Sequence, residues 1–338
     1  MNNNTPIDIV YLWVDGNDPS WRRKRERAAS RLSAGHRSAI GLYGNVEGRF
    51  RDNDELRYSL RALERYFPAH GQIYIVTDDQ APEWLRPSAR IRLVDHRDLI
   101  PAGSLPTFDS SNIESYIHRI PGLSERYFYV NDDVFFGAPV RVDDWFWDDG
   151  VYAAWSDEPE VSDEALRPDA NSMDNACRLS HQWLKARSGQ AALPAPRRAP
   201  YEPTFCTFAH APRPMLRSVL FELEALAPEL FERVRSTVFR TWDKPTIVSD
   251  FVIRWGLAHG RARMRDYTHL HVSTGDADLA YPLELLASLA GAVDFFCIND
   301  TTDNAPRDDP RLRRVRDVLQ ALFPQASSFE RQPALVAC

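Results

Sequence analysis

The sequence predicts an α/β protein in which a mostly parallel sheet with flanking helices is followed by a mainly helical second half. Three apolar segments, 7–14, 72–77 and 127–130, have the near-continuous hydrophobicity of strands that are covered on both faces. Helical patterns alternate with these strands in the first part of the chain. Beyond the third strand, tryptophans, acids and helical patterns dominate, so we expect two halves, 1–142 and 143–338.

The first helices are marked by their apolar spacing and by residues typical of helix ends. The first strand ends at a polar turn, 15–18, and the charged segment 21–37 that follows is expected to form an exposed helix. The pattern over 52–67 predicts an amphipathic helix. Asp52 and Glu55 resemble a capping box at its start.

Further elements of the first half follow the same signals. A short strand is expected at 91–94. A second helix is expected to begin at Ser111, because Glu114 completes a similar box, and to end at the helix-breaking pair 121–122.

The second half carries mainly helical patterns. Pro214 is expected to open a helix that reaches Leu226, because proline is favoured in the first turn. The segment 293–298 resembles a short strand, and the Pro- and Arg-rich segment 193–203 is typical of a loop or lid. Further helices are expected near 247–259, 283–290 and 310–323.

Composition excludes several classes of protein. A net charge of −7 and a pI near 5.8 argue against a nucleic-acid partner. No apolar stretch approaches the roughly 18 residues of a membrane span, and the first residues lack a signal-peptide pattern. We therefore expect a cytoplasmic protein, for which association with the inner face of the membrane stays open. Four cysteines without a C-x-x-C pair argue against a zinc knuckle and fit reduced thiols: Cys177, Cys206, Cys297 and Cys338.

Acidic residues follow the predicted strands, and they are the main functional signal. Ligands of open α/β sheets bind beyond the carboxyl ends of the strands. Carboxylates gathered there repel one another unless a cation lies between them, and hard cations prefer oxygen ligands. We therefore expect a Mg²⁺ or Mn²⁺ site for a phosphorylated, nucleotide-like substrate, although Asp and Asn also favour plain turns. The clusters are Asp15-Gly16-Asn17-Asp18, Asp78-Asp79, Asn131-Asp132-Asp133 and Asn299-Asp300.

Arginines surround the start of the predicted helix 52–67. A helix N-terminus favours anions, and guanidinium groups grip phosphate with two hydrogen bonds. The alternative is surface ion pairing, which we favour for Arg61. The arginines are Arg49, Arg51, Arg57 and Arg61. His210, Arg240 and Asp243 are less distinctive by themselves, since a lone histidine is more often structural than catalytic.

Several blocks together resemble the Stealth family of sugar-1-phosphate transferases. Its members include bacterial capsular polysaccharide phosphotransferases and the lysosomal-enzyme N-acetylglucosamine-1-phosphotransferase. The first block contains Leu12-Trp13-Val14-Asp15-Gly16-Asn17-Asp18, and the second ends in Asn131-Asp132-Asp133. The matching segments are 7–18, 48–61, 73–78, 105–110, 113–114, 118–123, 131–137, 209–212, 239–240 and 296–300.

The resemblance implies a Rossmann-like or GT-A-like fold and a specific reaction. A sugar 1-phosphate would pass from a nucleotide-diphosphate sugar to a hydroxyl of an acceptor glycan, as in capsule or exopolysaccharide synthesis. The product would be a phosphodiester, and a nucleoside monophosphate would leave. The half 1–142 would bind the nucleotide sugar, and 143–338 would complete the active site.

The resemblance also implies roles for particular residues. His210 would activate the acceptor or act as a nucleophile, and Asp133 would take part in catalysis. The phosphoryl charge would be neutralised by Arg49, Arg57 and Arg240. The metal would be held by Asp132, Asp133, Asn299 and Asp300. The substrate pocket would be formed by Trp13, Asp15, Gly16, Asp18, Asp52, Asn53, Glu55, Asp78 and Asn131.

Two other functions compete with this one. A metal-dependent glycosyltransferase would use the same donor and the same acidic strand ends. A non-catalytic protein that binds glycans or nucleotides would need no reaction at all. The sequence leaves open the sugar, the nucleobase, the acceptor, the linkage position and the oligomeric state.

Overall fold

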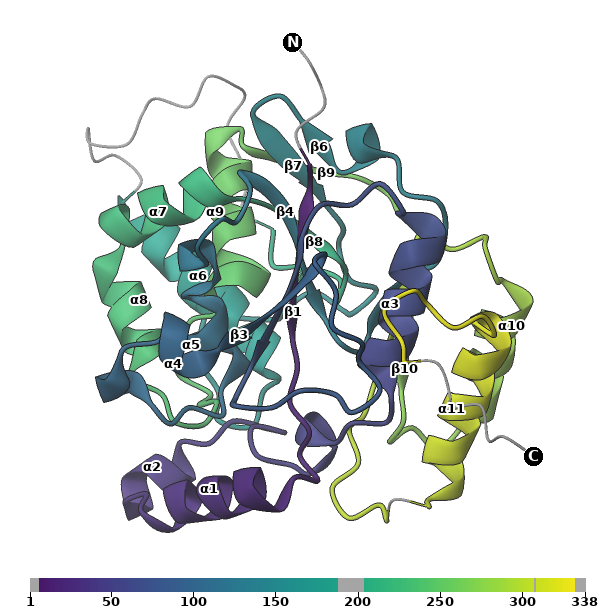
Figure 1. The fold of residues 1–338 in the computed structure, drawn as a ribbon. Helices are drawn as coiled ribbons and strands as arrows, with labels where there is room; N and C mark the ends of the chain where they lie inside the picture. Colours follow the sequence, from purple (N-terminus) through teal and green to yellow (C-terminus); the bar gives the residue numbers. More distant parts are fainter. Residues whose placement is uncertain (1–5, 188–203, 307, 332–338) are drawn as a thin grey trace, which may run out of the picture.

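The computed structural model describes residues 6–187, 204–306 and 308–331 (Figure 1). Within these residues, no helix is long and apolar enough to cross a membrane. The cysteines in this part of the chain, Cys177, Cys206 and Cys297, are free thiols. The loop predicted at 193–203 and Cys338 lie outside the described residues.

A five-stranded sheet forms the centre of the molecule, in the order β3-β2-β1-β4-β8. Its strands are β1 (Asp8–Leu12), β2 (Ile73–Thr77), β3 (Ile91–Asp95), β4 (Arg126–Asn131) and β8 (Arg213–Leu216). The first four run parallel, and β8 joins β4 antiparallel. The prediction of an α/β fold with a mostly parallel sheet is therefore confirmed.

Two small sheets extend this framework. One has the order β10-β11-β5 and the other β6-β7-β9. Their strands are β5 (Val134–Phe136), β6 (Phe146–Trp147), β7 (Gly150–Ala153), β9 (Ala262–Met264), β10 (His269–Ser273) and β11 (Phe295–Asn299). Since β8 joins the central sheet and β11 pairs with β5, the second half of the chain shares sheets with the first.

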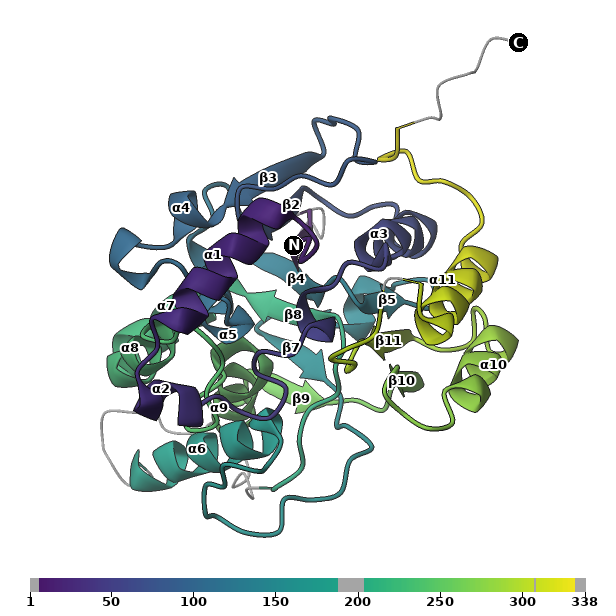
Figure 2. The same cartoon turned by 90° about the horizontal axis from the view of Figure 1, so that it is seen from below.

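Helices cover both sides of the central sheet, as Figures 1 and 2 show. Helices α5, α7, α8 and α9 lie on one side, whereas α3, α10 and α11 lie on the other. The helices are α1 (Pro19–Ser30), α2 (Ala34–Ser38), α3 (Glu55–Tyr66), α4 (His96–Leu99), α5 (Ser110–Glu114), α6 (Ser172–Arg187), α7 (Arg217–Leu226), α8 (Pro228–Arg235), α9 (Val252–His259), α10 (Ala280–Ser288) and α11 (Pro310–Leu322). A π-helix, Ile247–Phe251, precedes α9.

The capping box predicted at Asp52 and Glu55 is wrong. Helix α3 begins at Glu55, after Asp54 in a left-handed conformation with φ of 69°. The Asp52 carboxylate accepts a hydrogen bond from Asp54 N (3.0 Å), and Glu55 accepts one from Asn53 N (2.5 Å). The chain makes a tight turn before the helix, so these acids stabilise the turn.

Two other predicted helix starts are wrong for related reasons. The N-cap of α5 is Asp109, which accepts a hydrogen bond from Ser111 N (3.1 Å), so Ser111 caps nothing. Pro214 lies within β8 and not at a helix start. Proline has no N–H for a strand ladder, but β8 is an edge strand of the central sheet, where this is tolerated.

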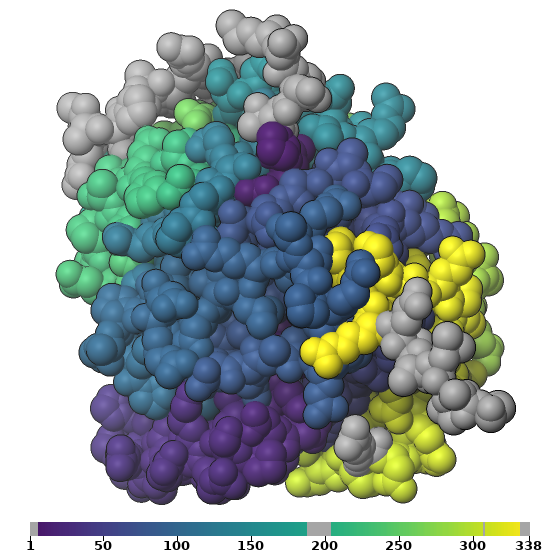
Figure 3. Space-filling view, viewed as in Figure 1, coloured from purple at the N-terminus to yellow at the C-terminus, as the bar shows by residue number. Residues whose placement is uncertain are grey.

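The C-terminal segment is fastened to α3 by a buried ion pair. Figure 3 shows this segment, in yellow, lying against the blue first half of the molecule. Arg61 donates two hydrogen bonds to Glu330 (2.7 and 2.8 Å), and Arg57 donates a third (2.6 Å). Burial acts to raise the pKa of Glu330, but the hydrogen bonds from Arg61, Ser327 N and Arg57 together outweigh it and bring the pKa to about 2.

We expect the Glu330→Gln substitution to lower the free energy of unfolding by about 3 kcal/mol, because it leaves the Arg61 guanidinium buried without its carboxylate. The folded-state pKa of Glu330 is below its ordinary value, so this stabilisation is present near neutral pH and is lost as the pH falls toward about 2. Urea unfolding of the wild type and the variant, near neutral pH and at acid pH, measures this difference in the free energy of unfolding. The control is Glu284→Gln, which removes the exposed ion pair with Arg314. It should lower the free energy of unfolding by less than about 1 kcal/mol. An equal loss in both variants would contradict this prediction.

Candidate active site

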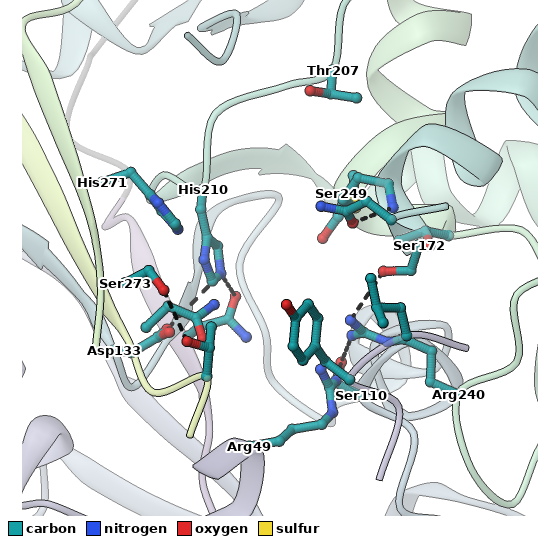
Figure 4. Close-up of a pocket in the computed structure, with 18 of the residues that line it drawn as sticks. Arg49, Ser110, Asp133, Ser172, Thr207, His210, Arg240, Ser249, His271 and Ser273 are labelled. Atoms are coloured by element: carbon teal, nitrogen blue, oxygen red, sulfur yellow. Dashed lines mark hydrogen bonds and ion pairs between the residues drawn. The ribbon is translucent and has the colours of Figure 1, made fainter. Parts of the chain in front are cut away.

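A cleft of about 930 Å³ opens at the carboxyl edge of the parallel strands (Figure 4). Strands β1 and β4 end side by side there, with Leu12 opposite Asn131. Trp13 follows the first strand into the cleft, and Asp132 and Asp133 follow the second. The cleft therefore lies where open α/β sheets bind their ligands.

Antiparallel strands bring distant segments to this edge. Strand β8 runs opposite to β4, so His210, three residues before β8, returns to the end of β4. Its Nε2 lies 3.1 Å from Asn131 Oδ1 and 3.9 Å from Asp133 Oδ1. Strand β11 runs opposite to β5, and Ile298 N donates to Asp133 O (3.0 Å). This pairing brings Asn299 to the same edge.

Burial raises the pKa of three carboxylates at or beside the floor of the cleft. Burial raises the pKa of Asp133 to about 6. The pKa of Asp132 is held well above its usual value by burial and then by the charges of Asp133 and Asp52. Asp52 does not itself line the cleft, and burial and the charge of Asp54 raise its pKa to about 7.

The same floor fits a hard divalent cation. Asp133 Oδ1 is buried and has no hydrogen-bond partner among the described residues. Crowded carboxylate oxygens are the ligands that Mg²⁺ and Mn²⁺ prefer, and a cation between them would relieve their repulsion. Asp132 and Asp133, which line the cleft, could hold such an ion.

Two guanidinium groups meet on another wall of the cleft. Arg49 Nη2 and Arg240 Nη2 both donate to Ser110 Oγ, at 2.9 and 2.7 Å. Burial and then the charge of Arg240 lower the pKa of Arg49 to about 10. Asp109 forms an ion pair with Arg240, with the Asp109 Oδ1 atom 3.7 Å from the Arg240 Nε atom. Two converging cations in a cleft form a site for an anion such as phosphate.

The surroundings of the His210 imidazole favour its neutral form. Burial and then the charge of Arg213 hold its pKa well below the usual value. The amide of Asn131 donates to the Tyr129 hydroxyl (3.2 Å), which donates to Glu114 (2.9 Å). This chain of hydrogen bonds turns Asn131 Oδ1 toward the imidazole, so Nε2 carries the ring hydrogen and Nδ1 the lone pair.

Other predicted residues lie at or beside the cleft. Glu55 and Asn299 line it. Asp300 also lines it, but its carboxylate is engaged by Arg51, Thr274 (3.0 Å) and Thr302 (2.7 Å). Asn53 connects the two acids, because its Nδ2 donates to Glu55 Oε1 (2.8 Å) and to Asp300 Oδ2 (3.4 Å).

Several predicted residues do not line the cleft, because local contacts use their side chains. Arg57 pairs with Glu330, and Asp78 pairs with Lys24 (2.5 Å). Asp18 is the N-cap of α1, and Asp15 accepts a hydrogen bond from Asn17 N (2.8 Å).

Gly16 is packed against the loop that carries Arg49. Its N–H donates to Phe50 O (2.7 Å), and a Cβ atom at this position would lie 2.2 Å from that oxygen. Only glycine allows this close approach. Gly16 thus positions the Arg49 loop and does not itself line the cleft.

Sequence reasoning missed the roles of Ser110 and Glu114. Both lie in segments that resemble the Stealth blocks, but Glu114 was interpreted as the partner of Ser111 in a capping box and Ser110 was assigned no role. Ser110 joins the two arginines. Glu114 is buried, lines the cleft and accepts hydrogen bonds from Tyr129 (2.9 Å) and Ser249 (3.4 Å). A buried glutamate facing a cleft is a stronger functional signal than its position at a helix start.

An α/β protein with carboxylates, arginines and an imidazole in one cleft at the end of its parallel strands has the features of an enzyme that handles phosphorylated ligands. Family comparison makes this specific. Three models of the Stealth family match the chain: conserved region 1 at residues 5–33, conserved region 2 at 49–154 and conserved region 4 at 289–337. The chain belongs to the Stealth family. His210 and Arg240 lie between the matched regions.

Similar curated proteins span nearly all of this chain. An exopolysaccharide phosphotransferase of Streptomyces coelicolor is 35% identical over 96% of the chain and 33% of its own length. The exopolysaccharide phosphotransferase CpsY of Mycobacterium tuberculosis is 32% identical over 98% of the chain and 59% of its own length. An exopolysaccharide phosphotransferase of Nocardia farcinica is 30% identical over 97% of the chain and 62% of its own length. The chain thus spans between a third and about three fifths of the length of these relatives.

Solved structures resemble the chain only distantly. The galactosyltransferase LgtC aligns with 95% of this chain and 98% of its own, with a TM-score of 0.42 and 11% identity. Mouse xyloside xylosyltransferase 1 aligns with 86% of this chain and 98% of its own, with a TM-score of 0.39 and 12% identity. A likeness this distant carries no argument about function.

Proposed function

We propose that this protein transfers a sugar 1-phosphate from a nucleotide-diphosphate sugar to a hydroxyl of an acceptor glycan, in the synthesis of a capsule or exopolysaccharide. The observation that carries the proposal is the meeting of Asp132 and Asp133, Arg49 and Arg240, and His210 in one cleft. The names of the similar bacterial proteins, exopolysaccharide phosphotransferases, support the same class of reaction.

The proposed reaction exchanges one phosphoester bond for another. The acceptor oxygen attacks the phosphorus nearest the sugar and loses its proton. The bond from that phosphorus to the bridging oxygen breaks, and the nucleoside monophosphate leaves with that oxygen. The bond between the anomeric carbon and its oxygen survives. Positioning and charge neutralisation supply most of the catalysis in such reactions.

The residues of the cleft divide these tasks. Arg49 and Arg240 bind the oxygens of the transferred phosphoryl group, whose charge they stabilise. Burial favours the neutral form of His210, whose lone pair on Nδ1, beside the Cys297 thiol (3.2 Å), would accept the acceptor proton. Asp132 and Asp133 would hold a Mg²⁺ or Mn²⁺ ion, which would neutralise charge on the diphosphate when bound. Trp13 and Glu55 shape the donor side of the cleft, and Asn131 orients the imidazole.

The nucleotide that is released tests this function. Purified protein is incubated with Mg²⁺, a panel of nucleotide-diphosphate sugars and glycan acceptors, and the products are separated by ion-exchange chromatography. We expect a nucleoside monophosphate and an equal amount of a phosphodiester that is visible by phosphorus NMR. A nucleoside diphosphate would indicate a glycosyltransferase. If no donor yields any nucleotide, a binding protein becomes the better description.

A further inference from the structure

A second set of metal ligands lies beside the carboxylates of the cleft. His210, His271 and Cys297 each offer one ligand atom, and these three atoms lie within 4.8 Å of one another. We propose that they form a binding site for Zn²⁺, or a cation of similar softness, that inhibits the enzyme by occupying His210. The inhibition rests on the proposed function, whereas the metal binding does not.

The fold builds this site from three separate segments. Strands β10 and β11 are parallel neighbours, and His271 is directly opposite Cys297 in their register. His210 comes from the loop before β8, and its Nδ1 lies 3.2 Å from Cys297 Sγ. Figure 4 shows the ring of His271 directed toward the ring of His210, which itself points toward Asp133. Two neighbouring strands therefore hold His271 and Cys297 in place beside the third ligand, His210.

The distances suit a tetrahedral ion. Zinc–nitrogen and zinc–sulfur bonds of about 2.0 and 2.3 Å place neighbouring ligand atoms about 3.5 Å apart. The pair Cys297 and His210 is already near that separation, at 3.2 Å. His271 is exposed, so its ring has room to complete the set and the ion has a path from solvent. Asp133 Oδ2, 3.6 Å from Cys297 Sγ, lies close enough for the fourth position.

The two donor sets select different cations. Imidazole nitrogen and thiolate sulfur favour zinc and related ions, whereas carboxylate oxygens favour Mg²⁺ and Mn²⁺. The lone pair of His210 is on Nδ1, the nitrogen that faces Cys297, because Nε2 faces the Asn131 oxygen. The ring is thus in the tautomer that a metal ion at this site requires.

Zinc binding has a direct consequence for the proposed reaction. A neutral imidazole has a single lone pair, so His210 can bind the ion or accept a proton from the acceptor, but not both. The Cys297 thiol gives up its proton to solvent when zinc binds, since the thiolate is the ligand. We therefore expect Zn²⁺ to inhibit at concentrations at which Mg²⁺ activates, and a chelator to restore turnover.

Metal binding is tested with Co²⁺ as a spectroscopic probe, on the full chain kept reduced and free of oxygen. We expect one equivalent of Co²⁺ to give a sulfur-to-cobalt absorption in the near ultraviolet and intense tetrahedral bands in the visible. Added Zn²⁺ should displace Co²⁺ and abolish both absorptions. Added Mg²⁺ should leave both absorptions unchanged. The sulfur band should be lost in Cys297→Ser and kept in Cys206→Ser, the control for a second thiol with its side chain near Glu160. A spectrum without the sulfur band in the wild-type protein would overturn the site, whatever the activity.

Inhibition is tested separately with His271→Gln, because His271 lines the cleft with an exposed side chain and is assigned no role in the proposed reaction. We expect turnover without zinc to stay within about twofold and the zinc concentration for half-inhibition to rise at least about tenfold. Equal sensitivity of His271→Gln and wild type would overturn the regulatory role. If cobalt binds as expected but no donor is turned over, the proposed function fails and the metal site stands.

Discussion

Replacing Asp133 with Asn should lower turnover about 10³-fold and remove its dependence on Mg²⁺, because the variant loses a carboxylate ligand of the cation that offsets the diphosphate charge. The same change should leave the protein at least as stable as the wild type in the absence of metal. Asp133 and Asp132 are crowded carboxylates, and Asp133 Oδ1 has no hydrogen-bond partner in the described part of the chain. Steady-state rates over a Mg²⁺ titration, with thermal unfolding of both proteins, measure the two effects.

The matched control for this substitution is Asp149→Asn, an exposed aspartate that does not line the cleft. It should change neither turnover nor the response to Mg²⁺. If Asp133→Asn instead unfolds the protein or keeps more than about a tenth of the wild-type rate, Asp133 does not serve the metal as proposed.

Replacing Arg240 with Lys should lower the rate of the chemical step about 10²-fold without loss of folding. The Arg240 guanidinium donates to Ser110 Oγ through Nη2 (2.7 Å) and to Ser172 Oγ through Nη1 (3.5 Å), and its Nε lies beside Asp109. Each Nη atom carries a second N–H, which we assign to the phosphate. An ammonium group keeps the charge but cannot make these contacts together. Single-turnover kinetics with saturating donor isolates this step from donor binding.

Arg57→Lys is the informative partner of this variant. The sequence places Arg57 and Arg49 alike at the start of α3, but the structure pairs Arg57 with Glu330 outside the cleft. Arg57→Lys should therefore keep turnover within about twofold. A loss as large as that of Arg240→Lys would return Arg57 to the phosphate site and count against this assignment.

Local patterns in the sequence were sufficient to predict the buried strands and the acids that follow them. A continuous apolar run such as β2 and the aspartates after β4 are local features, and parallel strands align their carboxyl ends. The meeting of Asn131 with His210 is not local. It depends on β8 joining β4 antiparallel at the edge of the sheet, and Pro214 within β8 has the local signature of a helix start.

Side-chain roles at helix starts were the least predictable part of the site. Glu55 and Glu114 have spacings typical of capping, but Glu55 hydrogen-bonds to Asn53 and Glu114 accepts from Tyr129. Arg49 and Arg57 both lie near the start of α3 in the sequence, and the distant Glu330 is the partner that takes Arg57 away from the cleft. Such choices depend on partners far along the chain. The division into halves at residue 142 stays a prediction.

The fate of the oxygen on the anomeric carbon tests the central claim most directly. The donor is prepared with ¹⁸O between the anomeric carbon and its phosphorus, and both products are analysed by mass spectrometry. Phosphoryl transfer keeps that bond, so we predict the label in the sugar phosphodiester and none in the released nucleoside monophosphate. Label recovered in a released nucleoside diphosphate would show that the anomeric bond breaks, and it would contradict phosphoryl transfer by this cleft.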